Sequence, residues 1–250
     1  MPGGGLRGLI DRTAERRAAD RSAAEQAAAG RPATDRRAAG RPAAVHDDSP
    51  CRCELCAAPI PADHRHLLEP AGREPRCACR PCALLFEHPP AEGDRYRLVP
   101  DRRWYLPDFA LDDATWAALD IPVQMAFACH DSAEGRTVIR YPGPAGAVEA
   151  AVEPAAWAAV EEANPVLRRL APDVEALLVN RTRDARDHWL VPIDDCFALV
   201  AVLRSHWKGL AGGQDVWNEV GAFFTELRRR AKPMPVGLLK SVGLSKGVSR

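Results

Sequence analysis

The sequence predicts an α+β protein in which an N-terminal finger, of the zinc-ribbon or treble-clef kind, precedes an antiparallel sheet packed against two C-terminal helices. Three observations lead to this prediction. Six of the eight cysteines fall within residues 51–82. From residue 121 onward, short apolar segments separated by turn residues indicate strands. Residues 194–231 then carry two apolar patterns of helical period.

The cysteines form two copies of the pattern C-x-C-x-x-C. The inner pairs of the two copies are Cys53 with Cys56 and Cys79 with Cys82. This C-x2-C … C-x2-C arrangement is typical of a tetrahedral metal site. Two thiolates separated by two residues in a tight turn can both reach one ion about 2.3 Å away. We therefore expect these four cysteines to be metal ligands.

Further ligand-type residues lie in the same stretch. Cys51 and Cys77 each stand two residues ahead of a pair, and His64 and His66 lie between the pairs. The two histidines, two residues apart, share one face of a strand. A lone histidine pair is more often a surface or packing feature than a ligand. These four residues are therefore candidate additional ligands, and in the simplest interpretation they do not bind metal.

The sequence leaves the identity of the metal open between zinc and iron. Structural zinc contributes on the order of 10–16 kcal/mol in small zinc peptides, and here it would replace a hydrophobic core. Iron at the same cysteines would make a rubredoxin-like electron carrier, because a tetrahedron of four sulfurs does not distinguish the two metals. The Cys-Pro-x-Cys-Gly knuckle of rubredoxins is absent, since residues 79–83 read CRPCA. A third interpretation is an iron–sulfur cluster or a labile metal, with His66 as an occasional ligand.

Disulfide bonds are the other use of such cysteines. The chain opens with MPGGGLRGLIDRTAERR, which has no apolar signal-peptide region, so we expect a cytoplasmic protein. A reducing compartment favours metal binding over disulfides. The composition also predicts no membrane span.

We expect five segments along the chain. The first is an Ala/Arg-rich tail that cannot bury enough apolar surface to fold, apart from a marginal helix over 6–29. Residues 121–231 are long enough to build a core of their own. The segments are a disordered tail (1–50), a cysteine-rich metal-binding finger (51–90), a connector (91–120), an α+β domain (121–231) and a basic flexible tail (232–250).

Residues 121–193 predict a sheet of four or five antiparallel strands. Turn residues such as DSAEG and PGP separate the apolar segments. Pro154 and Pro165 stand where the first turns of two short helices would begin. The expected strands cover 121–130, 136–142, 146–152, 174–180 and 188–193.

Capping residues and apolar spacing predict three further helices. Asp112 or Asp113 can cap a brief helix that holds Trp116, and Asp194 can cap an apolar helix that ends near residue 207. The last helix has one apolar stripe that would face the sheet. The stripe consists of Val216, Trp217, Val220, Phe223, Phe224 and Leu227.

No pattern in the sequence indicates catalysis. Phosphate-binding loops, dinucleotide fingerprints, nucleophile elbows and zinc-protease helices are absent. Cys196, with His188 and Asp194 or Asp195 nearby in sequence, is the best candidate nucleophile. It stands at the start of an apolar helix, where a free cysteine usually packs as a small hydrophobe, and Cys129 is interpreted in the same way. We therefore expect a protein that is not an enzyme.

Charge gives little support for nucleic-acid binding. The formal net charge of the whole chain is zero. Residues 228–250 carry seven basic residues and no acidic residue. No aromatic residues are interleaved there for base stacking. A nucleic-acid-binding zinc protein is therefore the third alternative for function, after a zinc-binding interaction protein and an iron or iron–sulfur electron carrier.

Several motifs resemble an uncharacterised bacterial protein family whose members are often encoded beside genes for [NiFe] hydrogenases. The resemblance covers about residues 51–230 and rests on CELC, HRHL, CACRPC, YPGPAGAVE, PDVEALLVNR and HWLVPIDDCFALV. It implies no activity. It implies an accessory role in the maturation, assembly or electron supply of the hydrogenase. The expected function is thus a non-catalytic zinc-binding accessory protein, with the hydrogenase or its maturation factors as protein partners.

Overall fold

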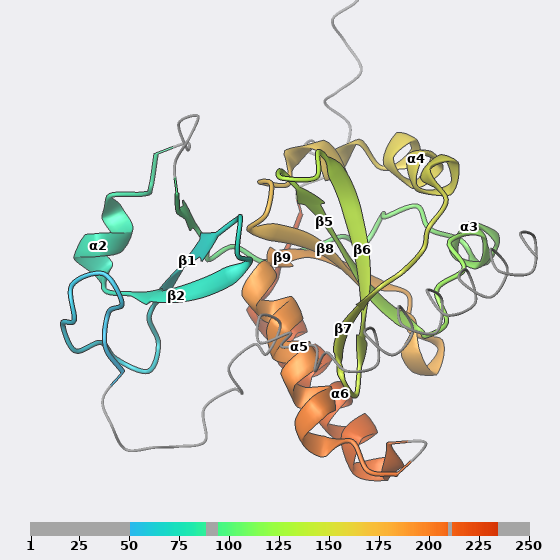
Figure 1. The fold of residues 1–250 in the computed structure, drawn as a ribbon. Coiled ribbons are helices and arrows are strands. Elements are labelled where there is room, and N and C mark those ends of the chain that lie inside the picture. Colours follow the sequence, from blue (N-terminus) through green and yellow to red (C-terminus); the bar gives the residue numbers. More distant parts are fainter. Residues whose placement is uncertain (1–50, 89–94, 210–211, 235–250) are drawn as a thin grey trace, which may run out of the picture. The chain divides into compact units, whose positions relative to one another are not determined.

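The computed structural model of the chain describes residues 51–88, 95–209 and 212–234, which form a mixed α+β structure (Figure 1). The tail expected at 1–50, with its Ala-rich helix, lies outside these residues, as does most of the basic tail. No helix in the described part of the chain is long and apolar enough to cross a membrane.

The cysteine-rich segment folds around a small antiparallel sheet. Strand β1 (Arg65–Glu69) lies between β2 (Glu74–Ala78) and β3 (Arg97–Leu98). A five-residue helix, α2 (Arg80–Leu84), follows β2 directly. Three buried side chains form the apolar cluster of this segment, namely Leu67, Ala78 and Ala83, and partly buried side chains pack against it. The segment has little core of its own, and its fold is compatible with a metal-binding finger.

A seven-stranded sheet forms the larger part of the structure, in the order β10-β4-β9-β8-β5-β6-β7. All neighbouring strands are antiparallel except β10 and β4, which are parallel. The expected hairpins are confirmed as β5 with β6 and β8 with β9. The strands are β4 (Trp104–Tyr105), β5 (Met125–Asp131), β6 (Arg136–Gly143), β7 (Gly146–Glu149), β8 (Glu175–Asn180), β9 (Asp187–Pro192) and β10 (Lys232–Pro233).

Helices pack on both faces of this sheet, and each face has its own apolar core. The two C-terminal helices share one core with the sheet, as expected. The helices that precede β8 share the other core and form a second layer, which the sequence does not predict. The first group is α5 (Ile193–His206) and α6 (Gly213–Arg230); the second is α3 (Asp113–Ala118), α4 (Pro154–Ala163) and η1 (Pro165–Arg169), and a 3₁₀ turn, η2 (Thr182–Asp184), joins β8 to β9.

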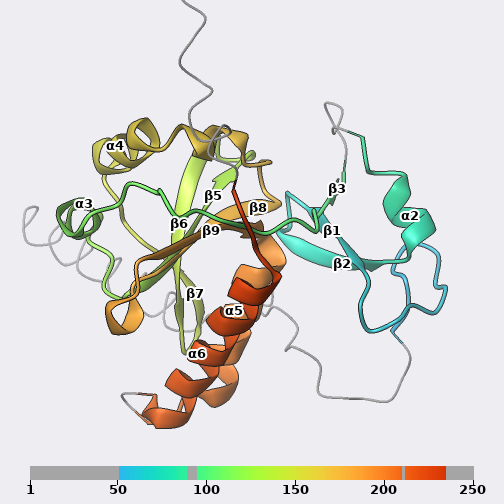
Figure 2. The ribbon, with the colours of Figure 1, turned by 180° about the vertical axis from the view of Figure 1, so that it is seen from behind.

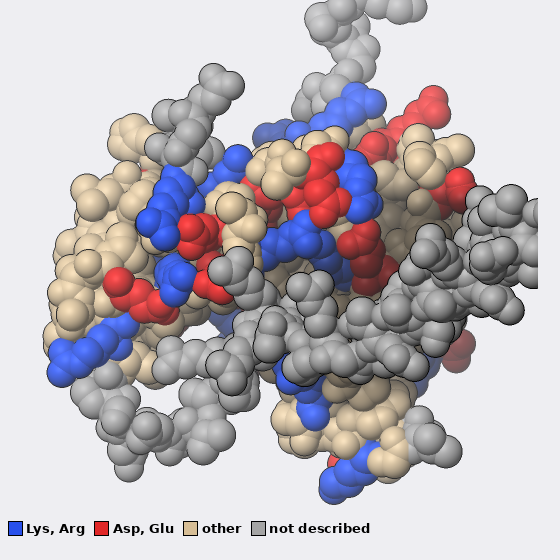
Figure 3. Space-filling model, in the orientation of Figure 1, with Lys and Arg blue, Asp and Glu red and all other residues tan. Residues whose placement is uncertain are grey.

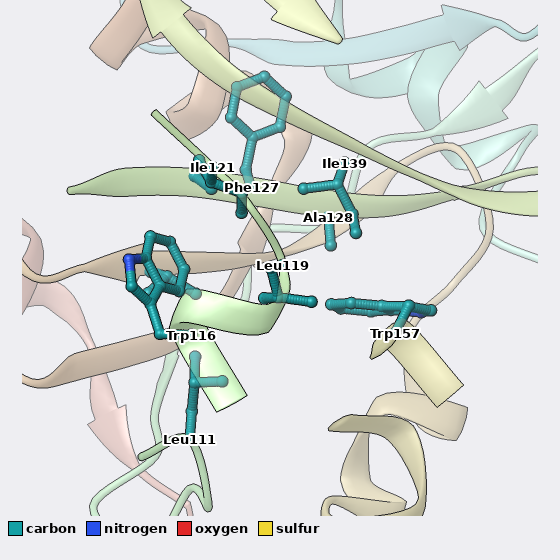
Figure 4. Close-up of a pocket in the computed structure, with 10 residues that line it drawn as sticks. Leu111, Trp116, Leu119, Ile121, Phe127, Ala128, Ile139 and Trp157 are labelled. Atoms are coloured by element: carbon teal, nitrogen blue, oxygen red, sulfur yellow. The ribbon is translucent and has the colours of Figure 1, made fainter. Parts of the chain in front are cut away.

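Packing on the α3 and α4 side is close. Figure 4 shows Leu119, which follows α3, pointing toward the ring of Trp157 of α4, with Ala128 and Ile139 of the sheet above them and Trp116 of α3 on the other side of Leu119. The space left between them is about 10 Å³. That is about the least that one water molecule needs. This recess is therefore part of the core and not a ligand pocket.

The local signals in the sequence are mostly confirmed. The Asp112 carboxylate caps α3 by accepting a hydrogen bond from the backbone N–H of Thr115 at 2.7 Å. Pro154 and Pro165 lie in the first turns of α4 and η1. The α6 stripe is also confirmed, with Val216, Val220, Phe224 and Leu227 fully buried.

The predicted cap of α5 was wrong. Pro192 occupies the N-cap position, and no side chain makes a capping hydrogen bond. Asp194 lies inside the first turn, where the positive end of the helix dipole favours a carboxylate. Its side chain contacts His66 instead.

The segments at the borders of the expected domains also carry regular structure. Residues 91–120, expected as a connector, contribute β3 to the small sheet, β4 to the large sheet and the helix α3. Residues 232–233, expected in the flexible tail, form β10, which follows α6 in Figure 2. Strand β1 alternates as a strand must. Its Leu67 belongs to the small core, and the adjacent Leu68 packs in the core under α5 and α6.

Candidate metal centre

Four cysteines of the cysteine-rich segment converge on one point. Their sulfur atoms all lie within 4.8 Å of one another, so this group can hold a metal ion. The Sγ atoms of Cys56 and Cys79 are 3.7 Å apart. A tetrahedron with metal–sulfur bonds of about 2.3 Å has edges of about 3.8 Å. A disulfide would need about 2.05 Å, and all eight cysteines are free thiols. The members of the group are Cys53, Cys56, Cys79 and Cys82.

The two pairs are held by different backbone shapes. In the first, the N–H of Ala57 bonds to the carbonyl of Cys53 at 2.8 Å, and Ala57 takes a left-handed conformation with φ of 60°. In the second, Cys79 occupies the N-cap position of α2 and Cys82 lies in the helix. The first pair is thus in a closed turn, and the second opens a helix.

Glu54 ties the first turn to the strand that leads into the second pair. Its backbone N–H bonds to the carbonyl of Cys77 at 2.8 Å. The backbone N–H of Cys77 bonds in turn to Oε1 of Glu54 at 3.0 Å. This two-way connection positions the two pairs relative to each other without a metal ion.

Thiols this close influence each other's pKa. Burial opposes ionisation of Cys53, but backbone N–H groups of Cys79, Cys56 and Leu55 stabilise its thiolate and lower its pKa to about 6. Hydrogen bonding to Cys79 and Cys56 raises the pKa of Cys82 to about 12. The Cys53 thiolate therefore forms readily, whereas the Cys82 thiol holds its proton strongly. A divalent cation removes this conflict, because it stabilises all four thiolates together.

A second group of ligand-type side chains lies in the same segment. One ligand atom each from His64, His66 and Cys77 lies within 4.8 Å of the others. His66 and Cys77 are direct partners across the β1–β2 pair. The ring centroids of the two histidines are 4.7 Å apart. Three of the four candidate additional ligands are thus together, whereas Cys51 is exposed and belongs to neither group.

Asp194 reaches this second group from α5. Its Oδ2 lies 2.9 Å from Nδ1 of His66. Hydrogen bonding to Asp194, and next to Cys77, raises the pKa of His66 to about 10. The imidazole ring therefore lies where its surroundings favour positive charge.

Charged side chains of both signs are interspersed on the face drawn in Figure 3. Arg76 shows the pattern, since its guanidinium contacts the carboxylates of Glu54, Glu69 and Glu74. A phosphate backbone requires a surface with an excess of positive charge. Among the described residues, this face offers no such surface.

Cys196, the candidate nucleophile, and His188, its candidate base, contact different cores of the protein. Cys196 is fully buried in the core under α5 and α6, and burial raises its pKa well above the usual value. His188 is stacked on Phe109, which belongs to the opposite core. Burial lowers the pKa of His188 to about 4. Burial also raises the pKa of Cys129 to about 12, so this thiol is inert as well.

A recess of about 250 Å³ lies beside α4 and contains Glu161. This carboxylate accepts hydrogen bonds from Trp157 Nε1 at 2.6 Å and from the Thr137 hydroxyl at 3.2 Å. It is the only carboxylate among the residues that line the recess. General acid–base chemistry on a pair of carboxylates is therefore not supported there.

A family model described as "Family of unknown function (DUF5947)" matches residues 52–231. The chain belongs to this family. No curated protein and no solved structure matches the chain. The DUF5947 region contains both groups of candidate ligands and all the helices described above.

Two residues of this centre, Asp194 and Glu54, carry no signal of their role in the sequence. Asp194 carries a capping signal and gives no sign of a distant histidine partner. Glu54 stands between the first two cysteines of the site as an ordinary surface residue. Their roles follow from contacts across 128 and 23 residues of chain, which no local pattern encodes.

Proposed function

We propose that this protein is a non-catalytic zinc-binding accessory protein of the reducing cytoplasm. Zinc bound by Cys53, Cys56, Cys79 and Cys82 holds the cysteine-rich segment as a rigid finger, and the seven-stranded domain is its platform. The convergence of the four sulfur atoms carries this proposal. It is supported by the small core of the segment, which leaves its stability to the metal.

The backbone around the cysteines favours a treble-clef-like zinc finger over a rubredoxin-like iron site. A rubredoxin-like site would have two similar Cys-Pro-x-Cys-Gly turns. Here the first pair lies in a turn closed by Ala57, and the second pair begins helix α2 after a β-hairpin. The order of turn, hairpin and helix is that of a treble-clef finger. Iron bound by the same four cysteines is the alternative to zinc.

Metal content with a visible spectrum tests the proposed site. We expect full-length protein purified without oxygen to contain zinc and to be colourless, because Zn²⁺ is d¹⁰ and has no redox chemistry. Cys53→Ser should lose the zinc bound by the four cysteines, and Cys51→Ser should lose none. Iron in a coloured sample, removed by the same Cys53→Ser change, would make the protein an electron carrier instead.

Exposed leucines on the finger support a docking role. Four large apolar side chains are exposed among the described residues, and three of them lie in the finger. Leu85 is 75% exposed and Leu84 is 48% exposed, both at the end of α2. The third is Leu55, inside the first cysteine turn. These leucines expose apolar surface beside both cysteine pairs, and a protein partner would bury that surface.

We propose a [NiFe] hydrogenase or one of its maturation factors as this partner, on the basis of the sequence resemblance. Co-expression with each candidate should show that one of them copurifies with the tagged full-length chain. Leu84→Glu with Leu85→Glu should weaken that complex at least ~10-fold, because apolar contacts at an interface centre dominate its affinity. Val148→Glu, an exposed apolar residue of β7, is the matched control. Failure of every candidate to copurify would contradict the partner class and leave the zinc site untouched.

A further inference from the structure

We propose that His64, His66 and Cys77 form a second metal site, which binds a divalent transition ion of the zinc class and leaves one coordination position open. The site shares no residue with the four-cysteine group. The inference goes beyond the proposed function, and it can fail while the four-cysteine site stands.

The hairpin places the three ligands on one face. His66 and Cys77 form a directly opposed pair of β1 and β2, where Cβ atoms are typically about 4.5–5.5 Å apart. His64 precedes His66 by two residues, so its side chain falls on the same face. The ligand atoms of all three lie within 4.8 Å of one another.

Hydrogen bonds on the far side of each ring select the atoms that face the metal. Nδ1 of His64 lies 2.8 Å from the carbonyl oxygen of Pro61, and Nδ1 of His66 lies 2.9 Å from the carboxylate of Asp194. Both oxygens can only accept, so each Nδ1 carries a proton and Nε2 is the atom left to bind a metal. For His66, the metal would displace a proton from Nε2 on binding. Metal-binding histidines usually have such an oxygen partner on the other ring nitrogen.

His64 supplies a further sign of a ligand. Its Nε2 atom is buried, and it has no hydrogen-bond partner among the described residues. A buried polar atom without a partner carries a cost in free energy that coordination would remove. The neighbouring His66 ring and Cys77 thiol are the groups that would complete the coordination.

The donor set indicates the class of ion. Two imidazole nitrogens and one thiolate suit Zn²⁺ and ions of similar size and softness, such as Co²⁺. Three protein ligands leave the fourth tetrahedral position for water or for a donor from another molecule. All three side chains are half-buried and none is enclosed in a core cluster.

A catalytic triad is the rival interpretation. Cys77, His66 and Asp194 follow the order of nucleophile, base and orienting carboxylate. Such a triad has no role for a second imidazole with a buried, unpartnered nitrogen. His64 therefore favours the metal site, and thiol reactivity becomes part of the test.

Anaerobic titration of metal-free, full-length protein with Co²⁺ tests the proposal. We expect two spectrally distinct bound forms, because four thiolates give Co²⁺ a different visible spectrum from two imidazoles and one thiolate. Cys77→Ser and, separately, His64→Ala should remove only the second form. Cys53→Ser should remove the four-thiolate form and, because it unfolds the β1–β2 hairpin, the second form with it. Cys51→Ser and His130→Gln, which change the same residue types outside both groups, should retain both forms.

Asp194 is a positioning residue of this site, and its substitution supplies a second readout. Asp194→Asn should lower the affinity of the second site for Co²⁺ by about 10–100-fold. The affinity of the four-cysteine site should stay unchanged, which a general loss of folding would not allow. Circular dichroism of each variant shows whether it is folded.

Two results would overturn the proposal. One is a single Co²⁺ equivalent per chain, with a spectrum unaffected by His64→Ala and Cys77→Ser in folded protein. The other is rapid alkylation of Cys77 by iodoacetamide that requires His66 and proceeds equally with and without Zn²⁺, which would indicate the nucleophile. Protection of Cys77 from iodoacetamide by one equivalent of Zn²⁺ beyond the four-cysteine site would support the metal.

Discussion

Cys53→Ser is expected to unfold the cysteine-rich segment and to leave the seven-stranded sheet folded. Serine has nearly the same size as cysteine, so the change removes a metal ligand and little packing. The apolar cluster of the segment itself contains only three buried side chains among the described residues, which is little to offset its chain entropy. Structural zinc contributes on the order of 10–16 kcal/mol in comparable small units, so its loss exceeds what this core can replace.

Hydrogen exchange of the full-length protein measures this effect segment by segment. Amides of β1 and β2 should lose at least ~100-fold of their protection in Cys53→Ser, which corresponds to about 3 kcal/mol. Amides of β5, β8 and β9 should change little. Cys51→Ser is the control, since Cys51 is exposed and outside both ligand groups. Unchanged protection of the hairpin in Cys53→Ser would show that the segment folds without metal at this site.

Arg103→Ala is expected to lower the free energy of unfolding by about 3–5 kcal/mol. Its guanidinium binds the carboxylate of Asp195 through two hydrogen bonds, of 2.6 and 2.9 Å. The two side chains are only 12% and 11% exposed. Removing the arginine leaves a carboxylate in the first turn of α5 that is mostly shielded from water and has lost its cation.

Urea unfolding compares the variants. Arg103→Lys should fall between wild type and Arg103→Ala, because an ammonium group cannot form the two parallel hydrogen bonds. Adding Asp195→Asn to Arg103→Ala should restore part of the loss, which identifies the unpaired charge as its cause. Arg95→Ala, which breaks an exposed pair with Glu69, should change stability little. Equal losses for the Arg103 and Arg95 variants would contradict this account.

Much of the fold could be predicted because its signals are local. Asp112, the two helix-starting prolines and the α6 stripe each act within one or two turns of chain, and the two hairpins are read from alternation and turn residues. The last two strands at one side of the sheet, β4 and β10, have two residues each, too short for a periodic pattern. Pairing across the sheet, not propensity, makes them strands. The face of the sheet on which α3 and α4 pack also depends on contacts between distant residues, so it could not be predicted from the sequence.

The candidate site could also be predicted only where its signals are local. The C-x2-C spacing states which sulfurs can share an ion, and the four cysteines do converge. The sequence could place His64 and His66 on one face of a strand but could not supply Cys77 opposite, because the β1–β2 register depends on the turn between them. From the sequence, Asp194 has the features of a helix cap, because capping is the commoner use of an aspartate at that place.

Asp194 and Asp195 are adjacent, so in a helix their side chains point about 100° apart, one toward His66 and the other toward Arg103. These contacts join residues 128 and 92 positions apart. The two cysteine pairs meet across only 23 positions. Loop closure costs more entropy for longer loops, and a chain is synthesised from its N-terminus. The cysteine pairs can therefore take up metal while the chain is still on the ribosome, before the helix that anchors the hairpin has been made.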